Sequence, residues 1–255
     1  CIRDRAEHPG QSGFHLLSSG MDAFLARIGL MERAQRTLDI QYYIWHTDTV
    51  GILLVDRLLS AADRGVCVRL LLDDLDTAGK DRGLMFLDAH PNIEIRLYNP
   101  FASRDKRGKD FVTDLARVNR RMQNKSLTAD NAATMVGGRN IGNEYFGATS
   151  HAEFSDLDVL GIGPIVYDVS VMFDAYWNSE SAIPFRAFTE GKEITEEQLT
   201  KARADFSKQV EEAKDNPYVA ALRESGALVR LQYDNLKFYW GNAELLHDAP
   251  TKVTA

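Results

Sequence analysis

Two neighbouring segments of the chain carry side chains suited to binding an oxyanion. Gln123 and Lys125 stand two positions apart in a stretch typical of a strand, so their side chains should point to the same face. Gly137-Gly138 follows the next predicted strand and permits a tight turn with positive φ, which can bring Asn140 back beside Lys125. An ammonium, a carboxamide and freed backbone N–H groups can bind a phosphate, although the same residue types also serve purely structural turns.

The spacing of these residues resembles the signature of the phospholipase D superfamily, His-x-Lys-x4-Asp-x6-Gly-Ser-x-Asn. Lys125, Asp130, Gly137 and Asn140 stand at the required intervals, with Gly138 in the serine position. The flanking sequence is similar to one branch, the bacterial cardiolipin synthases of the C type, in the segments 41–45, 70–74, 99–101, 136–140 and 154–159. The resemblance implies a phospholipase D-like fold and a phosphatidyltransferase, which exchanges phosphodiester bonds on phospholipids.

The motif histidine is replaced in this chain by Gln123. In the family this histidine is the nucleophile on phosphorus or the general acid for the leaving group, so the resemblance implies a phosphohistidine intermediate and two successive displacements. A carboxamide is a poor nucleophile and has no useful basicity near neutral pH. We therefore expect the chain to bind phosphate and to be impaired or inactive in turnover, whether Gln123 is natural or was introduced to trap a substrate.

The family's active site needs two such motifs that face each other, from two halves of one chain or from two subunits. A second motif is absent from this sequence, because His151 and His247 lack the accompanying Lys and Asp. The remaining histidines are isolated and expected to be surface or structural residues: His8, His15, His46 and His90. The chain therefore looks like the N-terminal half of a roughly doubled protein, and we expect its partner to be a second motif-bearing half or subunit.

The resemblance also implies roles for four residues of this half-site. Lys125 and Asn140 would contact the phosphate oxygens. Asp130 would belong to the structural hydrogen-bond network of the motif. Asp156 matches an acidic position suspected to orient the catalytic histidine, with a buried structural acid as the alternative.

Further residues could contact the rest of a phospholipid. Tyr43 and Trp45 could line the lipid side of the cleft, or pack in an aromatic core. Arg120 and Arg121 could help to capture phosphate. The basic stretch 104–109 could meet anionic head groups at a membrane surface, unless it is only a solvated loop.

We expect neither a cofactor nor a metal ion. Asp73, Asp74 and Asp76 cluster after a buried strand, but acidic residues at strand ends are common and the sequence shows no convergent ligand set. The chemistry that the resemblance implies is metal-free.

Alternating helical and strand patterns surround these residues and predict the fold. Apolar or alternating segments indicate strands at 37–45, 66–72, 93–98, 125–130, 133–136, 156–162 and 227–240. Periodic apolar residues indicate a helix ending near 36 and helices at 49–64, 84–89, 164–178, 193–215 and 217–226, with Thr49 as a candidate cap. This rhythm predicts an α/β layer fold with a largely parallel sheet. The family resemblance implies that this is a phospholipase D-like mixed, largely parallel sheet flanked by helices.

The character of the sequence changes near Pro184. We expect a phospholipase D-like domain over residues 1–184, and a helical and strand extension over 185–255 that leads toward an absent second half. Cys67 lies in the apolar run 66–72 and is expected to be a small core residue. Two cysteines are too few for a disulfide scaffold.

Composition narrows the classes of function. The 255 residues carry a net charge of −7 and are 44% hydrophobic, which fits a globular protein and disfavours nucleic acid as a partner. The apolar runs are much shorter than the ~20 residues of a spanning helix. The chain begins with Cys1, which predicts either a lipoprotein acylated on Cys1 or a trimmed chain, and we expect a peripheral or lipid-anchored protein at a bacterial membrane.

Three functions remain open at this point. The first is a phosphatidyltransferase half-domain of the cardiolipin synthase type, or a phospholipase if water is the acceptor. The second is a non-catalytic half that binds lipid or phosphate, or docks a partner. The third is a phospholipase D-like nuclease, against which the acidic composition and the lipid-branch flanking sequence both count.

Overall fold

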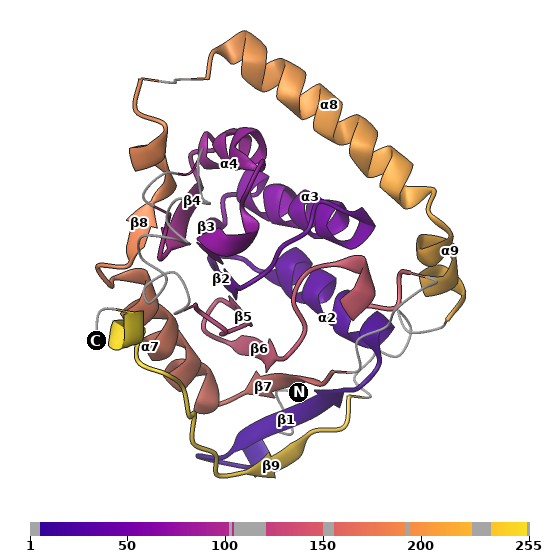
Figure 1. Cartoon of the computed structure of the whole chain (residues 1–255). Coiled ribbons are helices and arrows are strands. Elements are labelled where there is room, and N and C mark those ends of the chain that lie inside the picture. Colours follow the sequence, from indigo (N-terminus) through magenta and orange to yellow (C-terminus); the bar gives the residue numbers. More distant parts are fainter. Residues whose placement is uncertain are drawn as a thin grey trace.

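The computed structural model describes residues 6–101, 104, 121–149, 156–191, 194–225 and 236–253. In chain order its strands are β1 (Ser12–Leu17), β2 (Thr37–Tyr42), β3 (Cys67–Asp73), β4 (Ile93–Tyr98), β5 (Ser126–Ala129), β6 (Ala133–Gly137), β7 (Asp158–Ile162), β8 (Ala182–Pro184) and β9 (Tyr239–Gly241). They form one nine-stranded sheet in the order β8-β4-β3-β2-β5-β6-β7-β1-β9 (Figure 1). The motif strands β5 and β6 therefore lie in the middle of the sheet.

The parallel part of the sheet consists of β2, β3 and β4. α3 (Thr49–Asp63) connects β2 to β3, and α4 (Asp81–Asp88) connects β3 to β4. The other pairs described are antiparallel. The expected mixed sheet flanked by helices is confirmed, but its parallel part is smaller than predicted, because a short connection such as residues 130–132 between β5 and β6 can join only antiparallel strands.

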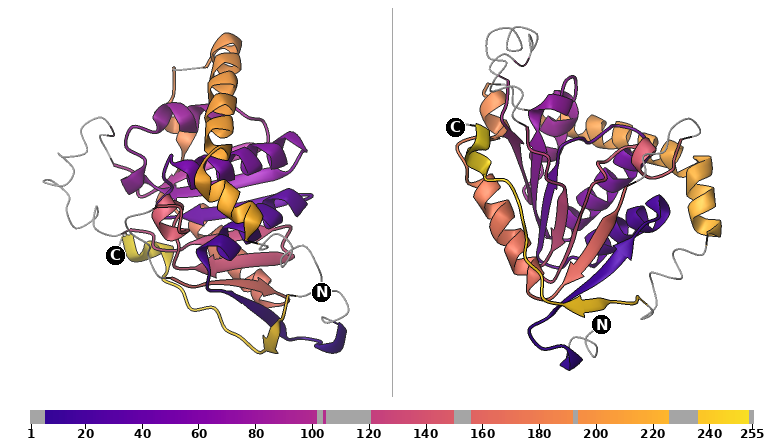
Figure 2. Two further views of the ribbon diagram at one scale, coloured as in Figure 1. Left: turned by 90° about the vertical axis from the view of Figure 1, so that its right-hand side faces the viewer. Right: turned by 60° about the horizontal axis from the view of Figure 1, so that its bottom comes forward.

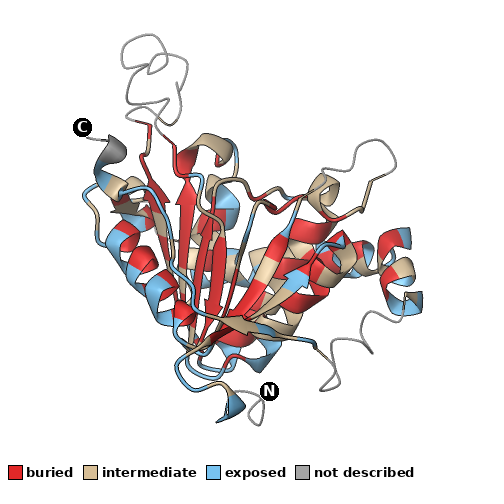
Figure 3. Ribbon diagram, turned by 90° about the horizontal axis from the view of Figure 1, so that it is seen from below, coloured by how far each residue is buried: buried red, intermediate tan, exposed pale blue. Residues whose placement is uncertain are grey.

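Successive residues of β3 point to opposite faces of the sheet and bury two separate cores. Leu70 and Leu72 belong to the larger core, with apolar residues of α2 (Gly20–Arg33), α3 and α4. Leu71 belongs to the smaller core, with α7 (Ile165–Trp177). Figure 2 shows α7 on one face and α2, α3 and α4 on the other, and Figure 3 shows the buried strands between them. Burial on both faces explains the continuous apolar run in β3.

The C-terminal part wraps around both helical layers. α8 (Glu196–Lys214) begins with a capping box and packs on α3 and α4, and α9 (Pro217–Glu224) follows it (Figure 1). β9 joins the sheet beside β1. Beyond it, the backbone carbonyls of Asp248 and Pro250 accept hydrogen bonds from Tyr176 and Tyr98. The division into residues 1–184 and 185–255 stays a prediction. β9, from the second part, joins the sheet of the first.

Short 3-10 helices complete the described structure. They are η1 (Asp74–Asp76), η3 (Asn143–Tyr145), η4 (Phe185–Phe188) and η5 (Pro250–Val253). η1 follows β3 and η3 follows β6, so both lie in segments that leave the central strands. Across the described residues, every helix is too short or too polar to cross a bilayer.

Most predicted elements are confirmed within a few residues, and the differences have local reasons. β1 was not predicted. It is a short strand that is stabilised by pairing with β7 and β9, which lie far away in the sequence, so the local pattern does not show it. Asp48, not Thr49, caps α3 by accepting a hydrogen bond from the Gly51 backbone N–H. Cys67 is exposed rather than buried, because burial of β3 begins only at its second residue. Of the strand predicted over 227–240, only the end lies in β9, and residues 226–235 are outside the described part.

Candidate active site

Lys125 projects from the residue just before β5, beside the end of β2. β5 pairs antiparallel with β2, so the start of β5 lies next to the chain that leaves β2. The Lys125 Nζ donates a hydrogen bond to the Gln123 carbonyl at 2.7 Å and lies 5.8 Å from the centre of the Tyr43 ring. Gln123 itself is exposed, and its side chain hydrogen-bonds the Tyr43 hydroxyl. The motif positions 123 and 125 thus gather around Tyr43.

Asn140 reaches the same place from the loop after β6. Its Oδ1 accepts a hydrogen bond from the Ile44 backbone N–H at 3.1 Å, and its Nδ2 donates to the Tyr145 hydroxyl at 3.2 Å. The side chain is buried, and the second N–H of the amide makes no hydrogen bond among the described residues. Since Tyr43 and Ile44 are consecutive, Lys125 and Asn140 flank one short segment of the chain.

Asp156 fills the space that a side chain at position 138 would need. A Cβ built on Gly138 would overlap both carboxylate oxygens of Asp156, so the carboxylate lies directly over the glycine backbone. The Asp156 Oδ1 accepts a hydrogen bond from the Leu157 backbone N–H at 2.8 Å. Glycine in the serine place of the motif therefore admits a carboxylate beside the loop that presents Asn140.

Burial and neighbouring carboxylates act in opposite directions on Lys125. Desolvation lowers the pKa of its ammonium below the usual lysine value, and the charges of Asp156 and Asp158 partly restore it. The pKa of Tyr43 is raised, chiefly by burial and then by the charge of Asp73. A partly desolvated ammonium interacts more strongly with an anion than one in bulk water, which suits Lys125 to bind phosphate.

Asp130 lies at the opposite end of β5 from Lys125. Its carboxylate accepts hydrogen bonds from three consecutive backbone N–H groups, those of Gln35 (2.9 Å), Arg36 (2.7 Å) and Thr37 (2.9 Å). Desolvation opposes ionisation, but these donors prevail and hold the pKa of Asp130 below its usual value. The structure thus places Asp130 where it fastens the start of β2, away from the other motif residues.

Arg121 is a buried cation beneath the site. Its Nη1 donates to Asp73 Oδ1 at 3.1 Å and to the Asn99 carbonyl at 2.9 Å. Its Nε and Nη2 are buried without a hydrogen-bond partner in the described part of the chain. Burial raises the pKa of Asp73 to about 6, although the Arg121 charge opposes the shift. Arg120, the other arginine proposed for phosphate capture, lies outside the described residues, as does most of the basic stretch 104–109.

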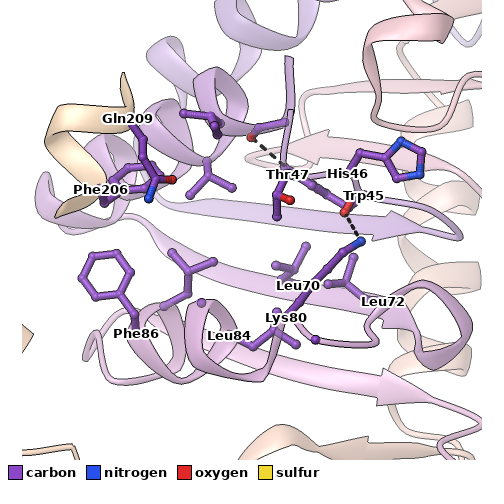
Figure 4. A pocket seen from close by; sticks show the side chains of 16 residues that line it. Trp45, His46, Thr47, Leu70, Leu72, Lys80, Leu84, Phe86, Phe206 and Gln209 are labelled. Atoms are coloured by element: carbon purple, nitrogen blue, oxygen red, sulfur yellow. Dashed lines mark hydrogen bonds between the residues drawn. The ribbon is translucent and has the colours of Figure 1, made fainter. Parts of the chain in front are cut away.

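Trp45 lies in a different environment. Its indole is buried, packs edge-on against Tyr42 with ring centres 5.6 Å apart, and lines a cavity of about 250 Å³ between α3, α4 and α8 (Figure 4). Leu70 and Leu72 of β3 also line this cavity, whereas Gln123, Lys125, Asn140 and Asp156 do not. The structure therefore brings Tyr43, but not Trp45, beside the motif residues.

Comparison with known proteins agrees with the geometry. A family model described as the phospholipase D-like domain of cardiolipin synthase matches residues 28–177. The chain belongs to this family. It is 45% identical over 247 residues to cardiolipin synthase C of Escherichia coli K12, which covers 97% of this chain and 52% of that protein. It is also 33% identical to an uncharacterized protein of Helicobacter pylori 26695, over 97% of this chain and 49% of that protein. The chain thus spans about half the length of these relatives.

A solved structure supports the fold of the family. Phosphatidylserine synthase of Haemophilus influenzae superposes with a TM-score of 0.53, covering 84% of this chain and 48% of that one. The sequences are only 12% identical, so this likeness concerns the fold alone. Together with the family model, it establishes a phospholipase D-like architecture for the chain.

Sequence reasoning missed the buried ion pairs behind the family motif. Asp158 is fully buried, and its Oδ2 lies 2.9 Å from Arg27 Nη1 and 3.4 Å from Arg139 Nη1. The other carboxylate oxygen lies over Gly137, where a Cβ would overlap it. Arginine and aspartate are rarely fully buried unless they are paired. Asp158 within an apolar strand was therefore the sequence signal that could have indicated a buried ion pair. The pairs hold the Gly137-Gly138 segment in place behind Asn140. Neither glycine has the positive φ expected for a tight turn; Gly137 ends β6 instead, and close contact with the two carboxylates is what requires glycine here.

Proposed function

We propose that this chain is one half of a phosphatidyltransferase of the cardiolipin synthase type, acting on the phosphodiester of a phospholipid. The observation that carries the proposal is the convergence of Lys125 and Asn140 on Tyr43 and Ile44. Both side chains offer N–H groups beyond those used within the site, and both come from the positions of the family motif. Family membership supplies the substrate class, and the geometry is consistent with an anion between the two side chains.

In this proposal the phosphate is bound by direct contacts and by a buried charge. Lys125 and Asn140 donate hydrogen bonds to the phosphoryl oxygens. Arg121 adds positive potential, because among the described residues its ion-pair partner is Asp73, whose own ionisation is weakened by burial. Charge-assisted contacts in a partly desolvated site are the stronger ones. Phosphate capture therefore does not depend on the residue at position 123.

Turnover does depend on that residue. In the family reaction a histidine nitrogen forms a bond to phosphorus while the bond to the leaving alcohol breaks, and an acceptor alcohol then displaces the nitrogen. The carboxamide of Gln123 cannot supply that nucleophile. We therefore infer that this chain binds the substrate phosphate, and that catalysis needs a histidine at 123 and a second motif-bearing half.

A non-catalytic role is the second candidate, and Gln123 is the observation that favours it. A half-site that holds a phospholipid without cleaving it could position the lipid or dock the partner that carries the active half. Both candidates put the chain at a membrane surface, which the basic stretch 104–109 could contact. A nuclease is the weakest candidate because the chain is acidic overall.

The test uses vesicles of phosphatidylglycerol and phosphatidylethanolamine. The chain and its Gln123→His variant are each combined with the second half of the E. coli relative, and cardiolipin and phosphatidic acid are measured. We expect product only from the His variant, and none when Lys125→Ala is added to it. Equal turnover by the Gln123 form would refute the nucleophile argument. DNA cleavage without any lipid product would refute the lipid substrate.

A separate binding measurement distinguishes the two candidates. Unmodified chain should cosediment with phosphatidylglycerol vesicles, and Lys125→Ala should weaken that binding. The Asp130→Asn variant is the matched control, because Asp130 is an acidic motif residue on the same strand pair but lies away from Lys125. If the His variant binds these vesicles as well as the unmodified chain yet yields no product with the second half, the non-catalytic role is favoured.

A further inference from the structure

A second group of chemically active side chains lies where the chain leaves β2 and where it leaves β6. His46 follows the end of β2, Asp48 caps α3, and Glu144 lies in η3. One ligand atom from each residue lies within 4.8 Å of those of the other two. His46 Nδ1 lies 3.2 Å from Glu144 Oε1. An imidazole nitrogen and two carboxylate oxygens thus converge from two segments, residues 46–48 after β2 and η3 after β6.

The backbone holds these side chains in place. The two oxygens of Asp48 accept hydrogen bonds from the backbone N–H groups of Gly51 (3.0 Å) and Asn143 (2.7 Å). The His46 backbone N–H donates to the Ile141 carbonyl at 2.8 Å. A Cβ at Gly142 would lie 2.8 Å from both His46 Nδ1 and a Glu144 oxygen, so glycine keeps the space between them open. The group is preorganised rather than a chance meeting of surface side chains.

The charge around His46 is unbalanced. Asp76 Oδ1 lies 3.7 Å from His46 Nε2, on the other side of the ring from Glu144. Three carboxylates therefore surround one imidazole, and all are partly buried. Within the described residues, Lys80 pairs with Asp76, and neither Asp48 nor Glu144 is paired with a lysine or arginine. Excess negative charge in a partly desolvated place is costly, and a dication would offset it.

We propose that His46 Nδ1 and the carboxylates of Asp48 and Glu144 bind a divalent transition-metal ion of the zinc type. Imidazole with oxygen donors suits zinc and its neighbours better than magnesium or calcium. On the Nε2 side, the negative charge of Asp76 at 3.7 Å favours a proton on Nε2, which leaves Nδ1 free for the metal. Figure 4 shows the His46 ring directed away from the apolar cavity that Trp45 and Lys80 line. His46 is itself one of the residues that line this cavity, so the proposed site borders it.

This metal site goes beyond the proposed phosphate binding and does not depend on it. Its consequence for the fold is a cross-link between the end of β2 and η3. η3 also carries Tyr145, whose hydroxyl accepts a hydrogen bond from the Asn140 side-chain amide. A bound ion would therefore stiffen the loop that presents Asn140.

Metal binding itself provides the test. The full chain, with Cys1 and Cys67 replaced by Ser because thiols bind the same metals, is freed of metal with a chelator and titrated with Co²⁺. We expect one ion per chain, with visible ligand-field absorption and a rise in melting temperature through linkage. His46→Ala and Glu144→Gln should each weaken binding at least tenfold, and Asp76→Asn should weaken it less, because Asp76 acts only through its charge at 3.7 Å from His46.

The control is His90→Ala, which removes a histidine paired with the single carboxylate of Asp63 at 3.3 Å. It should bind Co²⁺ like the parent. Melting temperatures measured without metal show whether each variant folds. If His46→Ala does not fold, the Co²⁺ affinity of Glu144→Gln is the measurement that tests the site. Absence of binding by the parent, or binding that neither His46→Ala nor Glu144→Gln weakens, would overturn the proposal. Preference for Ca²⁺ over Co²⁺ would overturn the assigned metal class.

Discussion

Replacement of Asp130 should lower stability and leave phosphate binding intact. The carboxylate accepts three backbone N–H groups, two on Oδ1 (Arg36 and Thr37) and one on Oδ2 (Gln35). Hydrogen bonds to a charged group contribute about 1.5–3 kcal/mol each when buried. The three bonds to Asp130 contribute less than this each, because they are partly exposed and share one carboxylate. We expect Asp130→Ala to lose roughly 2–3 kcal/mol from these contacts, and about 1 kcal/mol more because φ is 54° at this residue.

Asp130→Asn provides the graded comparison. Asparagine tolerates the left-handed backbone and keeps the oxygen that accepts two of the three N–H groups, so its loss should be about 1 kcal/mol. Because folding lowers the pKa of Asp130 from 3.8, its contribution is fully present above pH 3.8 and is lost as the pH falls through the lowered value. The difference between parent and Asp130→Asn should therefore shrink in strong acid.

Urea denaturation of parent, Asp130→Asn and Asp130→Ala measures these differences, and vesicle binding is measured in parallel. The reasoning is refuted if Asp130→Ala stays within about 0.5 kcal/mol of the parent, the usual range for a neutral surface change. It is also refuted if folded Asp130→Asn loses phosphate binding, since Asp130 would then act at the site.

Three further predictions concern Gly137 and Gly138 and the buried charges. Gly137→Ala should lower the free energy of unfolding, measured in urea, more than Gly138→Ala, because the new methyl group displaces the fully buried, ion-paired Asp158 rather than a partly exposed carboxylate; equal losses would contradict this. The pKa of Lys125 is lowered by burial, so phosphate affinity, followed by titration calorimetry, should fall with rising pH earlier than for an ordinary lysine. Folding raises the pKa of Asp73 from 3.8 to about 6, so its contribution favours the folded state in acid and is lost as the pH rises through this window. Relative to Asp73→Asn, the free energy of unfolding of the parent should fall by on the order of 3 kcal/mol over this range. A difference in urea midpoints that does not change with pH would contradict the shift.

The sequence determined the elements of the central sheet and the identity of the motif. Periods of two and of 3.6 residues are local properties, so the predicted strands at 66–72 and 93–98 match β3 and β4 closely. The motif spacing was equally local, and family membership confirmed the resemblance. The direction of a strand in the sheet was harder to infer than its presence. The sequence indicated β5, β6 and β7 as strands, but it did not predict their antiparallel pairing.

Only the tertiary structure decided which motif residues share a site. Lys125 and Asp130 both flank β5, yet an extended strand separates its two ends, and Asp130 meets the start of β2 instead. Tyr43 and Trp45 were equivalent in the sequence, but the strand ends between Tyr42 and Trp45, so the two side chains reach different places. His46 and Glu144 carry no shared pattern at all. Their meeting depends on how β2 and β6 are ordered in the sheet, because contacts between residues far apart in the chain exist only once the fold has brought the strands together.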